Sequence, residues 1–249
     1  MDTIKAVVLA AGKGTRLQAH DNDAPKVMRE ACGKPLLWYV LGALSFLEKK
    51  DIVIVVGYKK DEVINAFGDY TFAVQAEQLG TGHAVMAAAP RLQGFEGSIL
   101  VCYGDMPIIK RETYEALINA HLEQKSDCTI LTAEASFPTY GRVVRDQDGS
   151  FLEIVEERDC TPEQLEITEL NSGVYLFRAA VLFDALGEIK NENSQGEFYL
   201  TDVPAILRGK GGNIGLLKRD LGDELLGVNT AAQLEQVEKI MNQCEASVE

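Results

Sequence analysis

The sequence lacks any long apolar run, and its amino terminus lacks a secretory leader. A transmembrane helix needs about 18 or more consecutive apolar residues, and no segment of the 249 residues approaches that length. Met1-Asp2-Thr3 passes directly into a short apolar stretch that ends in glycines, which is unlike a leader peptide. We therefore expect a cytoplasmic protein that does not bind membranes.

Cysteine is also scarce. The five cysteines are odd in number, scattered along the chain and free of any C-x-x-C pair. Such a set favours neither a disulfide framework nor a zinc site. We expect reduced cysteines that fill space in the core.

Positive charge is in short supply: 24 lysines and arginines stand against 38 aspartates and glutamates, for a formal net charge of -14. Nucleic acids and anionic membranes are bound by basic faces, so neither is an expected partner. A small polyanion is still possible, because a few cations and backbone N–H groups gathered in one cleft act at short range. Such a ligand requires a local cluster of cations in this acidic chain.

Strand and helix patterns alternate through the first half of the chain, of which 46% overall is hydrophobic. The predicted strands are Ile4–Ala10, Ile52–Val56, Thr71–Gln75, Ser98–Tyr103 and Thr129–Ala133, and the predicted helices are Leu36–Glu48, Asp61–Phe67, Gly82–Arg91 and Tyr114–Lys125. This alternation predicts an α/β fold with a doubly wound, mostly parallel, Rossmann-like sheet. Ligands of such sheets lie beyond the carboxyl ends of the strands.

The pattern changes after about residue 135 to shorter and more polar strands. Arg142–Val144 and Phe151–Val155 are joined through Asp148-Gly149, a strong hairpin signal. We expect a β-rich insertion at about 136–170 in a domain that spans 1–229, followed by a C-terminal helix within 230–249. The remaining predicted elements are a strand at Gly173–Phe177 and helices at Ala180–Glu188, Leu200–Arg208 and Ala231–Gln243.

A glycine turn, Ala11-Gly12-Lys13-Gly14-Thr15-Arg16-Leu17, follows the first strand. Glycines there let successive N–H groups form a concave nest that suits phosphate oxygens. The dinucleotide motif needs a third glycine where Leu17 stands, and the Gly-Lys-Ser/Thr of the P-loop is missing. A tight strand-to-helix turn also explains the glycines, but Lys13, Arg16 and Lys26 lie close together in an acidic chain and favour an anion site.

The decamer Gln75–Ala84 (QAEQLGTGHA) ends one predicted strand and opens a helix. An amide side chain can pair with the donor and acceptor edges of a pyrimidine, while Gly80 and Thr81 allow close approach of a planar ring. An N-capped helix after a glycine turn would explain the glycines but not the polar string before them.

Two oxygen-bearing residues stand at positions where a metal ion could bind. Asp105 follows the predicted strand Ser98–Tyr103, at the carboxyl edge of the sheet, where Mg²⁺ favours one or two protein oxygens with phosphates and water. Turn formation is the alternative for this aspartate. Asn229, taken alone, is most simply an N-cap of the last helix.

Together these motifs resemble the sugar nucleotidyltransferase superfamily, and within it the N-acetylglucosamine-1-phosphate uridylyltransferases. The opening L-A-A-G-x-G-T-R-L followed by P-K resembles the triphosphate-binding turn, and the decamer resembles the uracil-recognising segment. Y-G-D at 103–105 and G-V-N at 227–229 resemble the magnesium motifs. Four further motifs follow in the family's order: Tyr140-Gly141-Arg142, Ile154-Val155-Glu156, Glu169–Gly173 and Gly196–Asp202.

The resemblance implies a reaction and a set of site residues. UMP would pass from UTP to N-acetylglucosamine 1-phosphate by Mg²⁺-assisted in-line displacement, with release of pyrophosphate. The implied nucleotide-binding residues are Leu9, Ala10, Ala11, Gly12, Gly14, Gln75, Gly80 and Thr81, and the implied sugar-binding residues are Tyr103, Gly104, Gly141, Glu156, Asn171, Tyr199 and Thr201. Arg16, Lys26 and Asp105 would be catalytic, and Asp105 and Asn229 would hold the metal ion. His83 receives no role as a general base, because a sugar phosphate is already ionised near neutral pH.

The resemblance covers nearly the whole chain, but only the uridylyltransferase half of a bifunctional bacterial enzyme. The other half is an acetyltransferase built from hexapeptide repeats, which this sequence lacks. The chain is therefore either a stand-alone transferase or part of a longer one.

The sequence departs from the family's motifs at a few positions. Ser172 and Phe198 replace residues more common in the family, and the loop His20–Ala24 is about one residue longer, which affects the expected pose of Lys26. Another sugar phosphate, such as glucose 1-phosphate, and a non-catalytic nucleotide-sugar-binding subunit are the alternatives, and the oligomeric state is left open.

Overall fold

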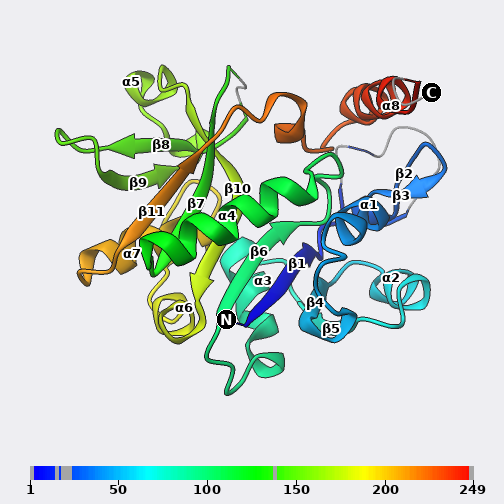
Figure 1. Cartoon of the computed structure of the whole chain (residues 1–249), viewed down its shortest axis with the longest axis horizontal. Helices are drawn as coiled ribbons and strands as arrows, with labels where there is room; N and C mark the ends of the chain where they lie inside the picture. The colour runs from blue at the N-terminus through cyan, green and yellow to red at the C-terminus, as the bar shows by residue number, and fades with distance from the viewer. Residues whose placement is uncertain (1–2, 15–16, 18–23, 137–138, 247–249) are drawn as a thin grey trace.

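The computed structural model describes residues 3–14, 17, 24–136 and 139–246, with side chains as far as residue 243. Its main strands are β1 (Ile4–Ala10), β4 (Ile52–Val56), β5 (Thr71–Val74), β6 (Ser98–Tyr103), β7 (Cys128–Glu134), β8 (Arg142–Arg145), β9 (Phe151–Val155), β10 (Glu169–Arg178) and β11 (Ile214–Lys218). They form one sheet in the order β11-β7-β10-β6-β1-β4-β5, with β8 joined to β10 and β9 joined to β8 (Figure 1).

The sheet is mostly parallel, as predicted. Strand β1 runs parallel to β4 and β6, β4 runs parallel to β5, and β11 runs parallel to β7. Strand β10 is antiparallel to both β6 and β7. The carboxyl ends of β1, β5 and β6 therefore meet at one edge of the sheet, where the polar motifs follow the strands.

Helices cover both faces of the sheet. They are α1 (Leu36–Ala43), α2 (Lys60–Ala66), α3 (Thr81–Ala88), α4 (Arg111–Gln124), α5 (Pro162–Leu165), α6 (Ala179–Leu186), α7 (Val203–Gly209) and α8 (Ala231–Ala246). Side chains alternate along a strand, so Val7 and Leu9 of β1 pack in one buried cluster with α3, α6 and α7, while Val8 and Ala10 pack in another with α1, α2 and α4. The two faces explain why the central strands are apolar along their whole length.

The last helix, α8, packs beside a small hairpin of β2 (Glu30–Ala31) and β3 (Lys34–Pro35) (Figure 1). Val237 of α8 belongs to a buried cluster with Ala31 and Leu36. The backbone N–H of Cys32, in the hairpin turn, donates to Glu238 Oε1 at 3.1 Å.

Among the described residues, no helix combines the length and the apolar composition needed to cross a bilayer.

Several predicted boundaries are wrong. The helix predicted for Leu36–Glu48 ends at Ala43, because Ser45 and Leu47 bond back three residues in tight turns instead of four. The strand predicted to begin at Gly173 begins at Glu169 and contains an irregularity between Asn171 and Tyr175. Strand β11 was not predicted at all.

Candidate active site

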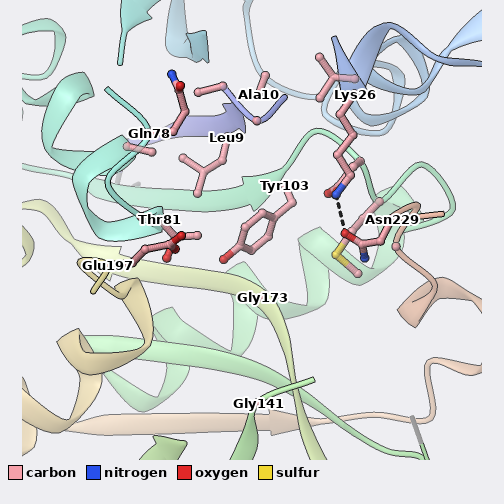
Figure 2. Close-up of a pocket in the computed structure, with 18 of the residues that line it drawn as sticks. Leu9, Ala10, Lys26, Gln78, Thr81, Tyr103, Gly141, Gly173, Glu197 and Asn229 are labelled. Carbon is pink, nitrogen blue, oxygen red and sulfur yellow. Dashed lines mark hydrogen bonds and ion pairs between the residues drawn. The ribbon is translucent and has the colours of Figure 1, made fainter. Parts of the chain in front are cut away.

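A cavity of about 390 Å³ opens at the carboxyl edge of the parallel strands. Residues from both halves of the chain line it: Leu9, Ala10, Ala11, Gly12, Lys26, Val27, Gln75, Gln78, Gly80, Thr81, Ala84, Tyr103, Asp105, Met106, Thr139, Tyr140, Gly141, Glu156, Asn171, Ser172, Gly173, Glu197, Gly227 and Asn229. Figure 2 shows Tyr103 between two groups, with Gln78 and Thr81 on one side and Lys26 and Asn229 on the other. A volume of this size is typical of a small-molecule site.

Lys26 meets Asp105 and Asn229 at one end of the cavity. Its Nζ donates to Asn229 Oδ1 at 2.7 Å (Figure 2). The same Nζ forms an ion pair with the carboxylate of Asp105. The side chains of Lys26 and Asp105 are each only 15% exposed, so water screens the pair weakly. Three segments that are far apart in the sequence thus place one cation and two oxygens together.

Gly14 shapes the path of the Lys26 side chain. It has a φ of +69°, and a Cβ at this position would lie 2.8 Å from Lys26 Cβ. A side chain there would collide with the lysine stem, so glycine is needed for both its conformation and its small size. Gly14 does not line the cavity, unlike Leu9, Ala10, Ala11 and Gly12. Arg16, the other cation predicted for this turn, lies outside the described residues.

Asn229 does not cap α8, because the next residue does. Thr230 Oγ1 accepts a hydrogen bond from the N–H of Gln233 at 3.3 Å, and Gln233 Oε1 accepts from the N–H of Thr230 at 3.0 Å. This reciprocal pair is a capping box. The side chain of Asn229 is thereby left to face Lys26.

The oxygens of Asp105 and Asn229 fit a single divalent cation. Lys26 Nζ contacts an oxygen of each, so the two oxygens lie close enough together to share one cation once the ammonium group turns away from them. In the described part of the chain, no group of three or more His, Cys, Asp or Glu side chains could hold a metal ion. A site with two protein oxygens is the kind that Mg²⁺ completes with phosphates and water.

Gln75 has a defined orientation at the other end of the cavity. Its Nε2 donates to the carbonyl of Gly80 at 3.0 Å and lies 3.1 Å from His83 Nδ1. A carbonyl can only accept, so the amide nitrogen must be the atom that faces Gly80, and the side chain presents its oxygen elsewhere. His83 thus contacts the same amide group through its ring nitrogen.

Gly80 allows the decamer to pack tightly against the segment before α7. It has a φ of +113°, and a Cβ would lie 2.5 Å from the backbone oxygen of Phe198. Thr81 Oγ1 then accepts a hydrogen bond from the N–H of Leu200 at 3.0 Å. These contacts fix the wall that carries Gln75.

The opposite wall comes from β10 and the β8–β9 hairpin. The N–H of Asn171 donates to the carbonyl of Gly141 at 2.9 Å, and Asn171 Nδ2 donates to the hydroxyl of Tyr175 at 2.6 Å. Gly173 has a φ of +82°, and a Cβ there would lie 2.5 Å from the ring of Tyr103. Burial raises the pKa of Glu156, and a hydrogen bond from Thr201 at 3.0 Å opposes that rise.

Three residues of the predicted sugar site lie behind the wall. Gly104 donates its N–H to the carbonyl of Leu9 at 2.9 Å and packs beneath the surface. Thr201 reaches the cavity through its bond to Glu156. The hydroxyl of Tyr199 donates to Asp159 Oδ2 at 3.2 Å and accepts from Gln195 Nε2 at 2.8 Å.

The cavity also has polar lining residues that the sequence did not single out. Gln78, Tyr140 and Glu197 all line it. Each lies inside a motif that the sequence showed: Gln78 in the decamer, Tyr140 directly before Gly141, and Glu197 within Gly196–Asp202. Their position in those motifs was the available signal.

Asp202, next to Thr201, makes stability depend on pH. Burial, together with the carboxylates of Asp159 and Glu153, raises the pKa of Asp202 from 3.8 to about 6. The folded protein then holds a proton that the unfolded chain releases, so this group lowers stability as the pH rises from about 4 to 6. We expect Asp202→Asn to raise Tm at pH 8 and to change it little near pH 4, as measured by thermal unfolding. Asp184→Asn, at an exposed position of α6, is the control and should change Tm little at either pH. An equal gain in Tm at pH 4 and pH 8 for Asp202→Asn would contradict the electrostatic cause.

The parallel sheet, the glycine turn and the cation with two oxygens at the strand ends define a nucleotide-binding transferase domain. Residues 6–208 match the family model of the MobA-like NTP transferase domain, and the chain belongs to that family. It is similar to the bifunctional protein GlmU of Brevibacillus brevis, with 43% identity over 243 residues that cover 97% of this chain and 52% of the relative.

Two further relatives carry the same name. The bifunctional protein GlmU of Streptococcus suis is 45% identical over 240 residues, which cover 95% of this chain and 51% of the relative. That of Pelobacter propionicus is 41% identical over 245 residues, which cover 97% and 53%. The chain spans about half the length of the curated relatives it matches.

Proposed function

We propose that this domain transfers UMP from UTP to N-acetylglucosamine 1-phosphate and releases pyrophosphate. The observation that carries the proposal is the meeting of Lys26, Asp105 and Asn229 in one cavity, which Gln75 and Glu156 also line. Two anionic substrates need cations at the point where they meet, and in this proposal Lys26 and a divalent cation on Asp105 and Asn229 supply them. The uridylyltransferase motifs and the similarity to GlmU proteins support this choice of substrates.

The cavity has a uridine end formed by Gln75, Gly80 and Thr81. The oriented amide of Gln75 offers an oxygen that accepts from the N3–H of uracil, whereas N3 of cytosine is itself an acceptor. Leu9, Ala10, Ala11 and Gly12 at the end of β1 bring backbone groups to the same cavity. In this proposal the glycine turn holds the triphosphate and Arg16 adds a second cation.

The acceptor end is formed by Tyr103, Gly141, Glu156 and Asn171. Their amide, carboxylate and backbone groups match the hydroxyl and acetamido groups of a sugar. Thr201 and Tyr199 support this end from behind, through Glu156 and Asp159 respectively. We assign the insertion at about 136–170 to sugar binding and the rest of residues 1–229 to the nucleotidyltransferase core.

The reaction is an in-line displacement without a covalent enzyme intermediate. An oxygen of the sugar phosphate attacks the α-phosphorus of UTP, the bond from that phosphorus to the bridging oxygen breaks, and pyrophosphate leaves with the electron pair. Lys26 binds the phosphates and neutralises charge that develops at the α-phosphorus. Asp105 and Asn229 hold Mg²⁺, which when bound supplies further neutralisation of the phosphate oxygens.

A substrate matrix tests the proposal. Pyrophosphate release is measured with Mg²⁺ for UTP, dTTP, CTP and GTP against N-acetylglucosamine 1-phosphate and glucose 1-phosphate. We expect the highest kcat/KM for UTP with N-acetylglucosamine 1-phosphate. With CTP, kcat/KM should fall by roughly a hundredfold or more, because the amide oxygen of Gln75 and N3 of cytosine are both hydrogen-bond acceptors. Faster turnover of another pair would replace the substrate assignment, and no release with any pair would overturn the enzymatic function.

A further inference from the structure

The loop Leu225–Asn229, here called the asparagine loop, is tied to the cavity on two sides. On one side the N–H of Val228 donates to the backbone carbonyl of Asp105 at 3.0 Å. On the other side the N–H of Gly227 donates to the hydroxyl of Tyr140 at 3.1 Å, and that hydroxyl donates to the carbonyl of Leu225. One tyrosine hydroxyl therefore holds two backbone groups of the loop that ends in Asn229.

Tyr140 is itself well anchored to the acceptor wall. Its backbone carbonyl accepts a hydrogen bond from Arg142 Nη1, and the side chain of Arg142 is buried. The next residue, Gly141, bonds through its carbonyl to the N–H of Asn171.

The amino-terminal end of α8 fixes the other end of the loop. Gln233 Oε1 accepts from the N–H groups of Asn229 and Thr230, at 2.8 and 3.0 Å. The backbone before Asn229 therefore depends on Tyr140 and Asp105, and the backbone after it depends on Gln233. A small shift of this loop would move Asn229 Oδ1, which lies 2.7 Å from Lys26 Nζ.

We propose that Tyr140 is a positioning residue, whose hydroxyl holds the asparagine loop so that Asn229 can share a divalent cation with Asp105. This inference rests on the proposed function, because it concerns the cation that the reaction uses. It differs from a direct role in substrate binding, which is the other possibility for a residue that lines the cavity. The two roles have different kinetic consequences.

Tyr140→Phe removes the hydroxyl and keeps the ring. We expect the Mg²⁺ concentration for half-maximal pyrophosphate release to rise between about 5-fold and 50-fold, the range for loss of one or two hydrogen bonds. At saturating Mg²⁺, the KM values for UTP and for the sugar phosphate should change less than about threefold. In the protein without metal or substrate, amide hydrogen exchange of the asparagine loop should become faster.

Tyr39→Phe is the matched control. The hydroxyl of Tyr39 donates to the carbonyl of Ala31 at 2.7 Å, so this variant also removes a tyrosine-to-backbone hydrogen bond, but one outside the cavity. The variant keeps the ring of Tyr39, which packs against the cluster that holds Leu226 and Val228 of the asparagine loop. Because it removes only the hydroxyl that bonds to Ala31, it should leave the Mg²⁺ requirement and the exchange of the loop unchanged. Similar Tm values for the two variants would separate the loop effect from a general loss of stability.

A double-mutant cycle tests whether Tyr140 acts through Asn229. In an Asn229→Ala background, Tyr140→Phe should raise the Mg²⁺ requirement by less than about twofold, because the residue that it positions is already gone. Equal effects of Tyr140→Phe in both backgrounds, or a change in KM with an unchanged Mg²⁺ requirement, would overturn the inference and leave the proposed function standing. A wild-type protein that releases pyrophosphate without any divalent cation would overturn the metal assignment and this inference together.

Discussion

Replacing Lys26 with alanine is expected to lower kcat for pyrophosphate release by roughly a hundredfold or more, the usual effect of removing one charged contact to a transition state. The ammonium group of Lys26 is held by Asp105 and Asn229 inside the proposed reaction site. Loss of this group leaves the negative charge that develops around the α-phosphorus without one of the two protein cations assigned to it. Steady-state kinetics at saturating UTP, sugar phosphate and Mg²⁺ measure the effect.

Lys34→Ala is a matched control for Lys26→Ala. It also removes one lysine charge, but Lys34 is exposed, lies over the ring of Trp38 and does not line the cavity. We expect it to keep turnover within about twofold of the wild type, because a distant exposed charge is strongly screened. Wild-type turnover in a folded Lys26→Ala protein would remove Lys26 from the mechanism.

Much of the fold could be predicted because the central strands are short apolar runs with clear ends. Strands β1, β6 and β9 have the bounds that the sequence predicted. Strand β11 was missed because its five residues follow two glycines and become a strand only by pairing with β7, more than 80 residues earlier. Long-range pairing of this kind leaves no local signal.

The site could be predicted as a set of motifs but not as a geometry. Asp105 could be placed because it comes two residues after the end of a buried strand. In contrast, nothing local to Lys26 and Asn229 indicates that they meet across 203 positions of the chain. The resemblance implied that Asn229 binds the metal ion, whereas the residue alone suggested a helix cap. In the structure Thr230 caps α8, so the side chain of Asn229 is not used as a cap. Tyr199 and Thr201 were expected to contact the sugar, but they lie behind the residues that line the cavity. Which residues of a motif reach the cavity depends on tertiary packing, which the sequence motif does not show.

Asp105→Ala is expected to reduce kcat to about the same extent as Lys26→Ala, a hundredfold or more, for a different reason. This change removes one of the two oxygens assigned to the cation and also the carboxylate that pairs with Lys26. Asp105→Asn keeps an oxygen but removes the charge, so it should bind Mg²⁺ more weakly while preserving the shape of the site. Added Mg²⁺ should therefore restore more turnover to Asp105→Asn than to Asp105→Ala.

The double variant of Lys26 and Asp105 separates two contributions of these residues. If both residues act on one transition state, the reduction in kcat in the double variant should be smaller than the product of the two single reductions. The reason is that the first substitution already disrupts the unit that the two contacting residues form. A control pair, Lys5→Ala with Asp51→Ala, also forms an ion pair, with 3.9 Å between the charged atoms, but lies away from the cavity and should leave kcat nearly unchanged. If the two reductions in kcat multiply in full in the double variant, the lysine and the aspartate act independently. We expect the opposite, because their charged groups are in direct contact.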